Sequence, residues 1–159
     1  MTQDSAQNQA IPQDAGVESD LPPPGYEPCE ILSDFPRMVA RLYVREDSPF
    51  RYIGTRVQQK HCNYLGVAHG GFLMTLIDYA LTYGTETPQD PRAVTLSLTT
   101  EFAGTASRGD WVAAQIDVLR LGKSVKFSNC DVWAGEERIV HASGIFKVYY
   151  KGQYNPGQK

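Results

Sequence analysis

One apolar segment restricts the fold of this chain more than any other feature. Residues 70–84 read GGFLMTLIDYALTYG. In a helix their apolar side chains fall on nearly every side: Phe72, Leu73, Met74, Leu76, Ile77, Ala80 and Leu81. A helix that is apolar all round has to be buried all round. The remainder of the domain is therefore expected to wrap around this helix.

Period-two patterns predict the sheet that does the wrapping. The apolar faces are Leu96, Leu98, Thr100 and Phe102; then Val112, Ala114, Ile116 and Val118; and last Val140, Ala142, Gly144, Phe146 and Val148. RLYVRE, FRYIGTRV and VKFSNCDVW have strand character as well. The short connectors AGTASRGD, RLGK and AGEE predict that successive strands pair antiparallel as a meander. These patterns predict an α+β domain, an antiparallel sheet of five to six strands wrapped around one long central helix.

The chain ends differ in composition from this domain. Residues 1–24 are polar, acidic and rich in Pro and Gln, which predicts a disordered tail. Residues 25–150 form the predicted domain, and 151–159 a C-terminal tail. Residues 1–36 hold seven acids and no Lys or Arg, although the whole chain has a net charge of only -3. A short helix is expected within 27–39, interrupted near Pro36.

Composition argues against several functional classes. There is no long apolar run and no signal-peptide pattern, so we expect a cytoplasmic protein that does not enter a membrane. The three cysteines form no C-x-x-C pair and the three histidines match no known ligand spacing, so we expect no metal and no cofactor. No dense run of Lys and Arg suggests a nucleic-acid partner.

The central helix carries the candidate chemistry. Gly70 and Gly71 stand where a helix start exposes unpaired N–H groups and a partial positive charge, although such glycines also occur in plain turns. Thr75, Asp78 and Thr82 form a narrow polar stripe, either a solvent-facing edge or one wall of a site. In partly apolar surroundings a carboxylate such as Asp78 is suited to act as a base.

Helix geometry then bears on assembly. Asp78 lies eight residues beyond Gly70, which is about 12 Å along the helix axis. One carboxylate cannot span this distance to a carbonyl bound at its own helix start. A site that uses both groups must take them from two subunits, and antiparallel helices would give two composite sites per dimer.

The spacing of these residues resembles a known family. Asn63, Gly66, His69, Gly70, Gly71, Leu76 and Asp78 match the pattern N-x-x-G-x-x-HGG-x-x-x-x-L-x-D. It resembles that of hotdog-fold acyl-CoA thioesterases of the phenylacetic-acid-degradation (PaaI) type. The similarity runs from about Leu42 to Val148. It implies a hotdog fold assembled as a homodimer or a dimer of dimers.

The resemblance also implies roles for individual residues. The Gly70 N–H would polarise the thioester carbonyl, and Asp78 of the neighbouring subunit would attack it or activate a water. Asn63 would help to position that nucleophile, and Thr95 would assist the water. His69 would hold the thioester end or simply stabilise the helix start. Further substrate contacts are expected from Gly71, Arg120, Lys123 and Lys126; the three bases would meet coenzyme A phosphates or form a solvated hairpin.

The expected function is therefore hydrolysis of an acyl-CoA, with an aryl or a medium- to long-chain acyl group, to the free acid and coenzyme A. Two alternatives use the same fold. One is a non-catalytic protein that binds acyl-CoA or an aromatic ligand. The other is an acyl-CoA hydratase, which acts on the acyl chain and releases no free thiol.

Overall fold

The computed structural model describes residues 21–86 and 93–149. Within them one seven-stranded sheet is antiparallel throughout and accompanies one long helix. The predicted tails lie outside the described residues, except for residues 21–24. The boundaries of the three predicted regions therefore remain predictions.

The elements follow one another with mostly short connections. The helices are α1 (Asp34–Val39), the 3-10 helix η1 (Gln59–His61) and α2 (Gly70–Thr85). The strands are β1 (Glu27–Pro28), β2 (Tyr43–Asp47), β3 (Phe50–Arg56), β4 (Ala93–Phe102), β5 (Trp111–Leu121), β6 (Val125–Ala134) and β7 (Glu137–Val148). Their order across the sheet is β1-β2-β3-β5-β6-β7-β4.

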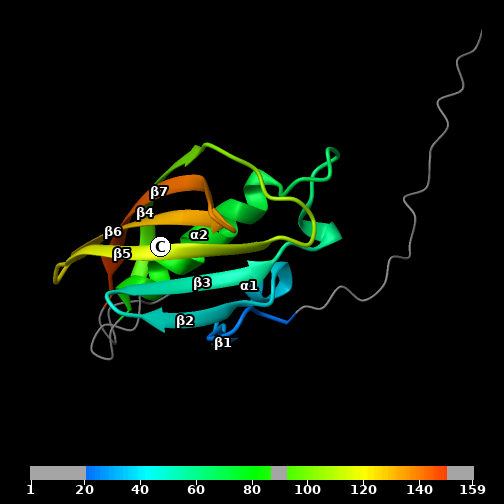
Figure 1. Cartoon of the computed structure of the whole chain (residues 1–159). Coiled ribbons are helices and arrows are strands. Elements are labelled where there is room, and N and C mark those ends of the chain that lie inside the picture. The colour runs from blue at the N-terminus through cyan, green and yellow to red at the C-terminus, as the bar shows by residue number, and fades with distance from the viewer. Residues whose placement is uncertain (1–20, 87–92, 150–159) are drawn as a thin grey trace, which may run out of the picture.

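The sheet curves around α2, as the apolar pattern predicted (Figure 1). Leu73, Ile77 and Ala80 are buried at the centre of the core that α2 shares with the inner face of the sheet. One side of α2 is less covered: Gly71 is exposed and Thr82 is half-buried in the single chain. No helix within the described parts of the chain is long and apolar enough to cross a membrane.

The predicted meander is correct for β5, β6 and β7 and wrong for β4. β4 pairs with β7, from Ala93 opposite Val148 to Phe102 opposite Val140, and β5 instead pairs with β3. The eight-residue connector AGTASRGD is long enough to cross from one part of the sheet to the other. As a result β4 is an edge strand.

Most residues of the predicted apolar faces are buried or half-buried, and the exposed exceptions are Leu96, Phe102 and Val118. All five predicted inward residues of β7 are buried. In β5, Val112 and Ile116 are buried, but Val118, the last residue paired before a bulge, is 36% exposed. In β4 a bulge between Thr95 and Ser97 leaves Leu96 58% exposed. A bulge leaves one residue of a strand without a partner in the ladder, and Leu96 is that residue in β4.

The short helix predicted within 27–39 is present as α1, but Pro36 does not interrupt it. Pro36 is the third residue of α1. In the first turn of a helix the N–H group has no intrahelical acceptor, so the missing proline N–H removes no bond there.

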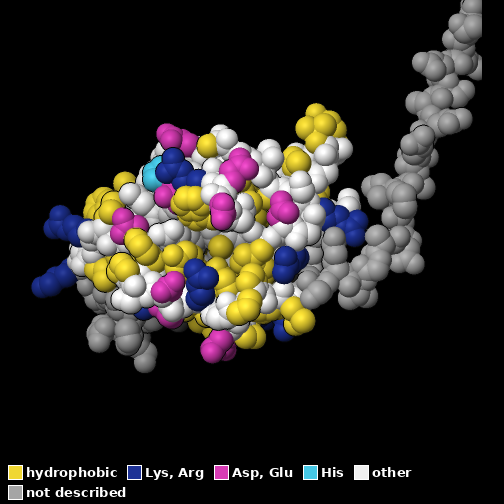
Figure 2. All heavy atoms as spheres, viewed as in Figure 1, with side chains coloured by type: hydrophobic (Ala, Val, Ile, Leu, Met, Phe, Trp, Pro, Cys, Tyr) yellow, Lys and Arg dark blue, Asp and Glu magenta, His cyan; other side chains and the backbone are white. Residues whose placement is uncertain are grey.

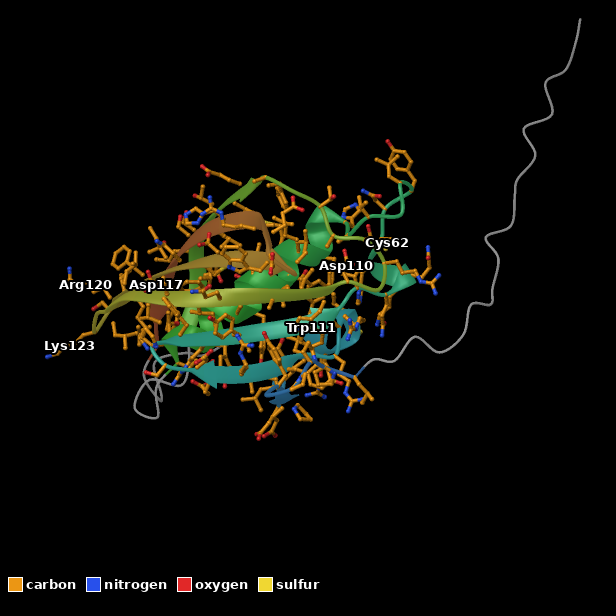
Figure 3. The ribbon with its side chains drawn as sticks, viewed as in Figure 1. Cys62, Asp110, Trp111, Asp117, Arg120 and Lys123 are labelled. Carbon is orange, nitrogen blue, oxygen red and sulfur yellow. The ribbon has the colours of Figure 1, made fainter. Side chains whose placement is uncertain are left out.

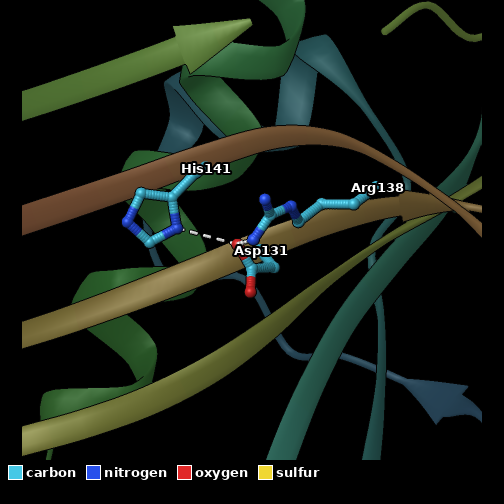
Figure 4. Close-up of polar contacts among 3 residues, drawn as sticks. All are labelled: Asp131, Arg138 and His141. Carbon is cyan, nitrogen blue, oxygen red and sulfur yellow. Dashed lines mark hydrogen bonds and ion pairs between the residues drawn. The ribbon is translucent and has the colours of Figure 1, made fainter. Parts of the chain in front are cut away.

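The outer face of the sheet, turned away from α2, mixes apolar and charged side chains (Figure 2). The His141 Nδ1 lies 2.8 Å from Asp131 Oδ1, and Arg138 Nη1 lies 3.5 Å from the same oxygen (Figure 4). This ion-pair cluster lies on the side of the sheet opposite α2, so it is separate from the helix start and from Asp78.

Candidate functional site

The start of α2 is capped by the side chain of His69. The His69 Nδ1 accepts a hydrogen bond of 2.9 Å from the Gly71 N–H, so the proton of the neutral imidazole lies on Nε2. The His69 carbonyl accepts from the N–H groups of Phe72 and Leu73 at 3.0 and 3.1 Å. His69 therefore stabilises the helix start, the structural role that its sequence position left open. Its ring is exposed, which leaves the Nε2–H accessible to a ligand.

The Gly70 N–H is the free donor of this first turn. It has no hydrogen-bond partner within 21–86 and 93–149, whereas the next three N–H groups are all bonded to His69. Gly70 is half-buried, and a Cβ atom there would lie 3.5 Å from Phe102 Cζ. An unpaired amide at a helix N-terminus can bind a carbonyl oxygen and stabilise developing negative charge on it.

The segment before α2 is held by backbone pairing. Ala68 N–H donates to the Ala106 carbonyl at 2.7 Å, and His69 N–H donates to the His61 carbonyl at 2.8 Å. Single bridges join Cys62 to Ala68 and Val67 to Ser107. The position of the Gly70 amide is thus set by two flanking segments of the chain.

Asn63 shapes the same loop. Its Oδ1 accepts from Leu65 N–H at 2.9 Å and from Val67 N–H at 3.4 Å. The amide oxygen is therefore committed to the turn. The Nδ2 group is the part of Asn63 that remains to contact a water or nucleophile.

His61 packs against the first turn of α2, a role that no sequence pattern indicated. Its ring stacks on Phe72 with centroids 4.1 Å apart. Its Nδ1 accepts from Gln58 N–H at 3.0 Å, and its Nε2 lies 2.8 Å from the Val39 carbonyl. Because Nδ1 accepts, the Nε2–H donates to Val39. This buried histidine joins α1, η1 and α2, and only the tertiary structure shows it.

Asp78 is held by a residue of the edge strand. The Thr95 hydroxyl donates a 2.7 Å hydrogen bond to Asp78 Oδ1. Both residues are half-buried, and Thr95 lies at the β4 bulge. The bond restricts the carboxylate and leaves its other oxygen, Oδ2, free of any partner among residues 21–86 and 93–149. A half-buried carboxylate with one free oxygen can serve as a base or a nucleophile.

The two halves of the candidate site are separated within one chain. Asp78 follows Gly70 by eight residues in the uninterrupted helix α2, a rise of about 12 Å. Thr75, Asp78 and Thr82 are all half-buried along the side of α2 that the sheet leaves partly open. The structure thus brings Asp78 to Thr95 and the Asn63 loop to Gly70, but it does not bring these two pairs together.

The three basic residues predicted to contact coenzyme A do not lie on one surface. Arg120 and Lys123 are exposed at the β5–β6 hairpin, at the end of β5 opposite Asp110 and Trp111 (Figure 3). Lys126 is only 1% exposed, and its Nζ donates to the Thr85 carbonyl at the end of α2. A cation is stabilised at this end by the helix dipole. Lys126 is buried in the single chain, so it does not share the exposed surface of the other two bases.

Comparison with known proteins gives the family. The model of the thioesterase superfamily matches residues 65–141. A putative esterase of Pseudomonas aeruginosa, PA0474, is 34% identical over 131 residues, which cover 79% of this chain and 96% of that protein. Human acyl-coenzyme A thioesterase 13 is 25% identical over 101 residues, which cover 62% of this chain and 72% of that protein.

A solved structure agrees with this result. The Escherichia coli PaaI protein from the phenylacetic acid degradation operon superposes with a TM-score of 0.63. It is 21% identical, and the match covers 68% of this chain and 79% of that chain. The sheet around α2 is therefore a hotdog fold, and the resemblance to PaaI-type proteins is confirmed. With a curated relative matched over nearly its whole length, the chain belongs to the thioesterase superfamily.

Proposed function

We propose that the protein hydrolyses acyl-CoA thioesters to the free acid and coenzyme A. The observation that carries the proposal is the pair of half-sites on α2, the unpaired Gly70 N–H and the Asp78 carboxylate held by Thr95. Membership of the thioesterase superfamily, and a relative named for acyl-coenzyme A hydrolysis, support the reaction class and the substrate class.

In the proposed reaction the substrate carbonyl oxygen accepts from the Gly70 N–H. The Asp78 carboxylate of a neighbouring subunit either attacks the carbonyl carbon or removes a proton from an attacking water. As the carbon becomes tetrahedral, negative charge develops on its oxygen next to the helix N-terminus, where the amide stabilises it. The C–S bond then breaks and coenzyme A leaves as a thiolate. If Asp78 is the nucleophile, water hydrolyses the resulting anhydride in a second step.

Other groups near the helix start have supporting parts in this proposal. The Asn63 Nδ2 group would donate to the attacking oxygen, since its Oδ1 is already bonded within the loop. The exposed His69 ring and Gly71 would flank the thioester. Arg120 and Lys123 would serve a site on another subunit, because they lie at the far end of the sheet (Figure 3).

The composite site requires a homo-oligomer, either a dimer or a dimer of dimers. Two features of the chain support one. On the half-open side of α2 the side chains of Gly71, Thr75 and Thr82 are small, which lets a second helix approach closely. The edge strand β4 exposes Val94, Leu96 and Phe102 by 43, 58 and 51%. An unpaired edge with exposed apolar residues favours pairing with another chain.

The first test measures coenzyme A release, with a thiol reagent, from a panel of aryl, medium-chain and long-chain acyl-CoAs. Turnover of at least one member supports the proposal and identifies the acyl class. Binding without thiol release would favour the non-catalytic binding protein. A change in enoyl absorbance without thiol release would favour the hydratase. The predicted cytoplasmic location is independent of this test and remains a prediction.

The Thr95–Asp78 hydrogen bond gives a second prediction. Thr95→Val removes the donor while keeping the side-chain shape, and should lower kcat about tenfold with little change in KM. Thr95→Ser keeps the hydroxyl and should retain most of the rate. Steady-state kinetics on the best acyl-CoA would check this. Equal losses in both variants would mean that packing, rather than the hydroxyl, is what Asp78 needs.

A further inference from the structure

A pocket of about 580 Å³ lies outside the half-sites described above. Its walls come from residues 29–32, from Arg37 in α1 and residues 40–42 after it, and from Gln58 and Lys60 around the start of η1. The volume lies in the range of pockets that hold small molecules. The family model begins at residue 65, so the whole lining lies outside the matched residues.

The walls of this pocket are tied together by hydrogen bonds. Arg37 Nη2 donates to the Ile31 carbonyl at 2.7 Å, which joins α1 to the segment before it. Thr55 Oγ1 donates to the Arg41 carbonyl at 2.7 Å, which fixes the segment after α1 to β3. The Cys29 N–H donates to the Leu42 carbonyl at 3.0 Å. The pocket is therefore a built part of the fold.

Its lining combines three cations, Arg37, Arg41 and Lys60, and one carboxylate, Glu30, with apolar surface. Arg41 and Lys60 are exposed at the pocket, and neither forms an ion pair with a carboxylate in the described residues. Arg41 lies over the Tyr43 ring at 5.5 Å. Ile31, Leu32 and Leu42 supply the apolar wall. Guanidinium and ammonium groups that have no carboxylate partner can bind phosphates. Apolar side chains line most small-molecule pockets.

The pocket also adjoins the start of α2. Lys60 directly precedes His61, whose carbonyl accepts from the His69 N–H at 2.8 Å. The N–H of Gln58, another lining residue, donates to His61 Nδ1. One wall of the pocket and the residue before Gly70 thus belong to one hydrogen-bonded unit. By contrast, Arg120 and Lys123 lie at the other end of β5 from the Ala106–Ser107 contact with the helix start.

We propose that this pocket binds the phosphorylated adenosine part of coenzyme A, with Arg41 and Lys60 contacting its phosphates. The inference rests on the proposed acyl-CoA hydrolysis and names a recognition site for that substrate. Arg37 is a positioning residue, because its guanidinium is already bonded to the Ile31 carbonyl and lies 3.6 Å from Asp34. The pantetheine arm of the substrate would then run from the pocket to the Gly70 amide.

The test compares an acyl-CoA with the pantetheine thioester of the same acid, which lacks the nucleotide. Arg41→Ala and Lys60→Ala should each raise KM for the acyl-CoA about tenfold. Neither should change kcat, or the KM for the pantetheine thioester. Arg138→Ala is the matched control, because it removes one exposed cation from the outer face of the sheet. It should leave KM and kcat unchanged for both substrates. An equal rise of KM for both thioesters, or an effect confined to Arg120→Ala and Lys123→Ala, would overturn the proposal.

A binding measurement separates this inference from the proposed function. Titration calorimetry with adenosine 3′,5′-bisphosphate should show binding to the full chain that weakens about tenfold in Arg41→Ala and falls with added salt. If no thioester is hydrolysed but this binding is present, the proposed function fails and the pocket is a nucleotide-phosphate site. If hydrolysis occurs and Arg41→Ala binds the bisphosphate like wild type, the pocket assignment fails alone.

Discussion

Asp78→Asn should lower kcat for acyl-CoA hydrolysis about a thousandfold while leaving the fold intact. The Asn side chain has nearly the same shape, and its Oδ1 can still accept from the Thr95 hydroxyl, which now bonds Asp78 Oδ1 at 2.7 Å. What disappears is the carboxylate charge, and with it the base or nucleophile. Thiol release under saturating substrate measures the change in kcat. Thermal unfolding measures whether the fold is intact.

Asp117→Asn is the matched control, because Asp117 is an exposed carboxylate on β5. It should leave kcat unchanged. If Asp78→Asn is folded and as active as Asp117→Asn, the carboxylate that drives the reaction lies elsewhere.

Subunit complementation tests whether the site is composite. Gly70→Pro removes the Gly70 N–H at the first helical position, where proline is favoured. His69 has φ -67° and ψ 137°, the extended conformation that a residue before proline requires. Gly70→Pro and Asp78→Asn should each be inactive alone. Co-expressed in equal amounts, they should regain about a quarter of wild-type activity through heterodimers with one intact site. No recovery in isolated heterodimers would place both groups in a single-chain site.

Gly84→Val should destabilise the protein by about 3 kcal/mol. Gly84 is buried in the last turn of α2 and faces β5, where a Cβ atom would overlap Ile116 Cγ2. The valine would also bring two methyl groups into this contact. α2 would have to move away from the sheet, and the tightly packed core resists that displacement. Chemical denaturation at a fixed protein concentration measures the loss.

A double-mutant cycle identifies the cause of that loss. Ile116→Ala removes the side-chain atoms that the valine would meet and should itself cost about 3 kcal/mol. The double variant Gly84→Val/Ile116→Ala should lose at least about 1 kcal/mol less than the sum of the single losses. Strict additivity would show that the close approach of Gly84 to Ile116 is not what limits this position.

Local patterns were enough for the central helix and most of the sheet. The side chains of α2, β7 and the first half of β5 repeat with helical or strand periods, and burial of those faces follows directly from the periods. In β6 the buried face instead includes Lys126 and Ser128. Pairing of β4 was mispredicted because a connector of eight residues fits either neighbour, and only the closure of the sheet selects β7. The bulges near Thr95 and Val118 could not be predicted either, since one inserted residue does not change the local hydrophobic pattern.

The sequence by itself determined which groups can do chemistry: an acid on an apolar helix and a glycine-rich helix start placed a fixed number of residues before it. Helix geometry alone then indicated that the acid and the helix start lie too far apart to act together within one chain. The tertiary structure decided how each is held, because Thr95 and His61 reach their partners across distances in the chain that no period encodes. It also decided where the cations lie, burying Lys126 and gathering Arg41 and Lys60 at one pocket. Such contacts depend on how the elements pack in space, which is a property of the whole chain.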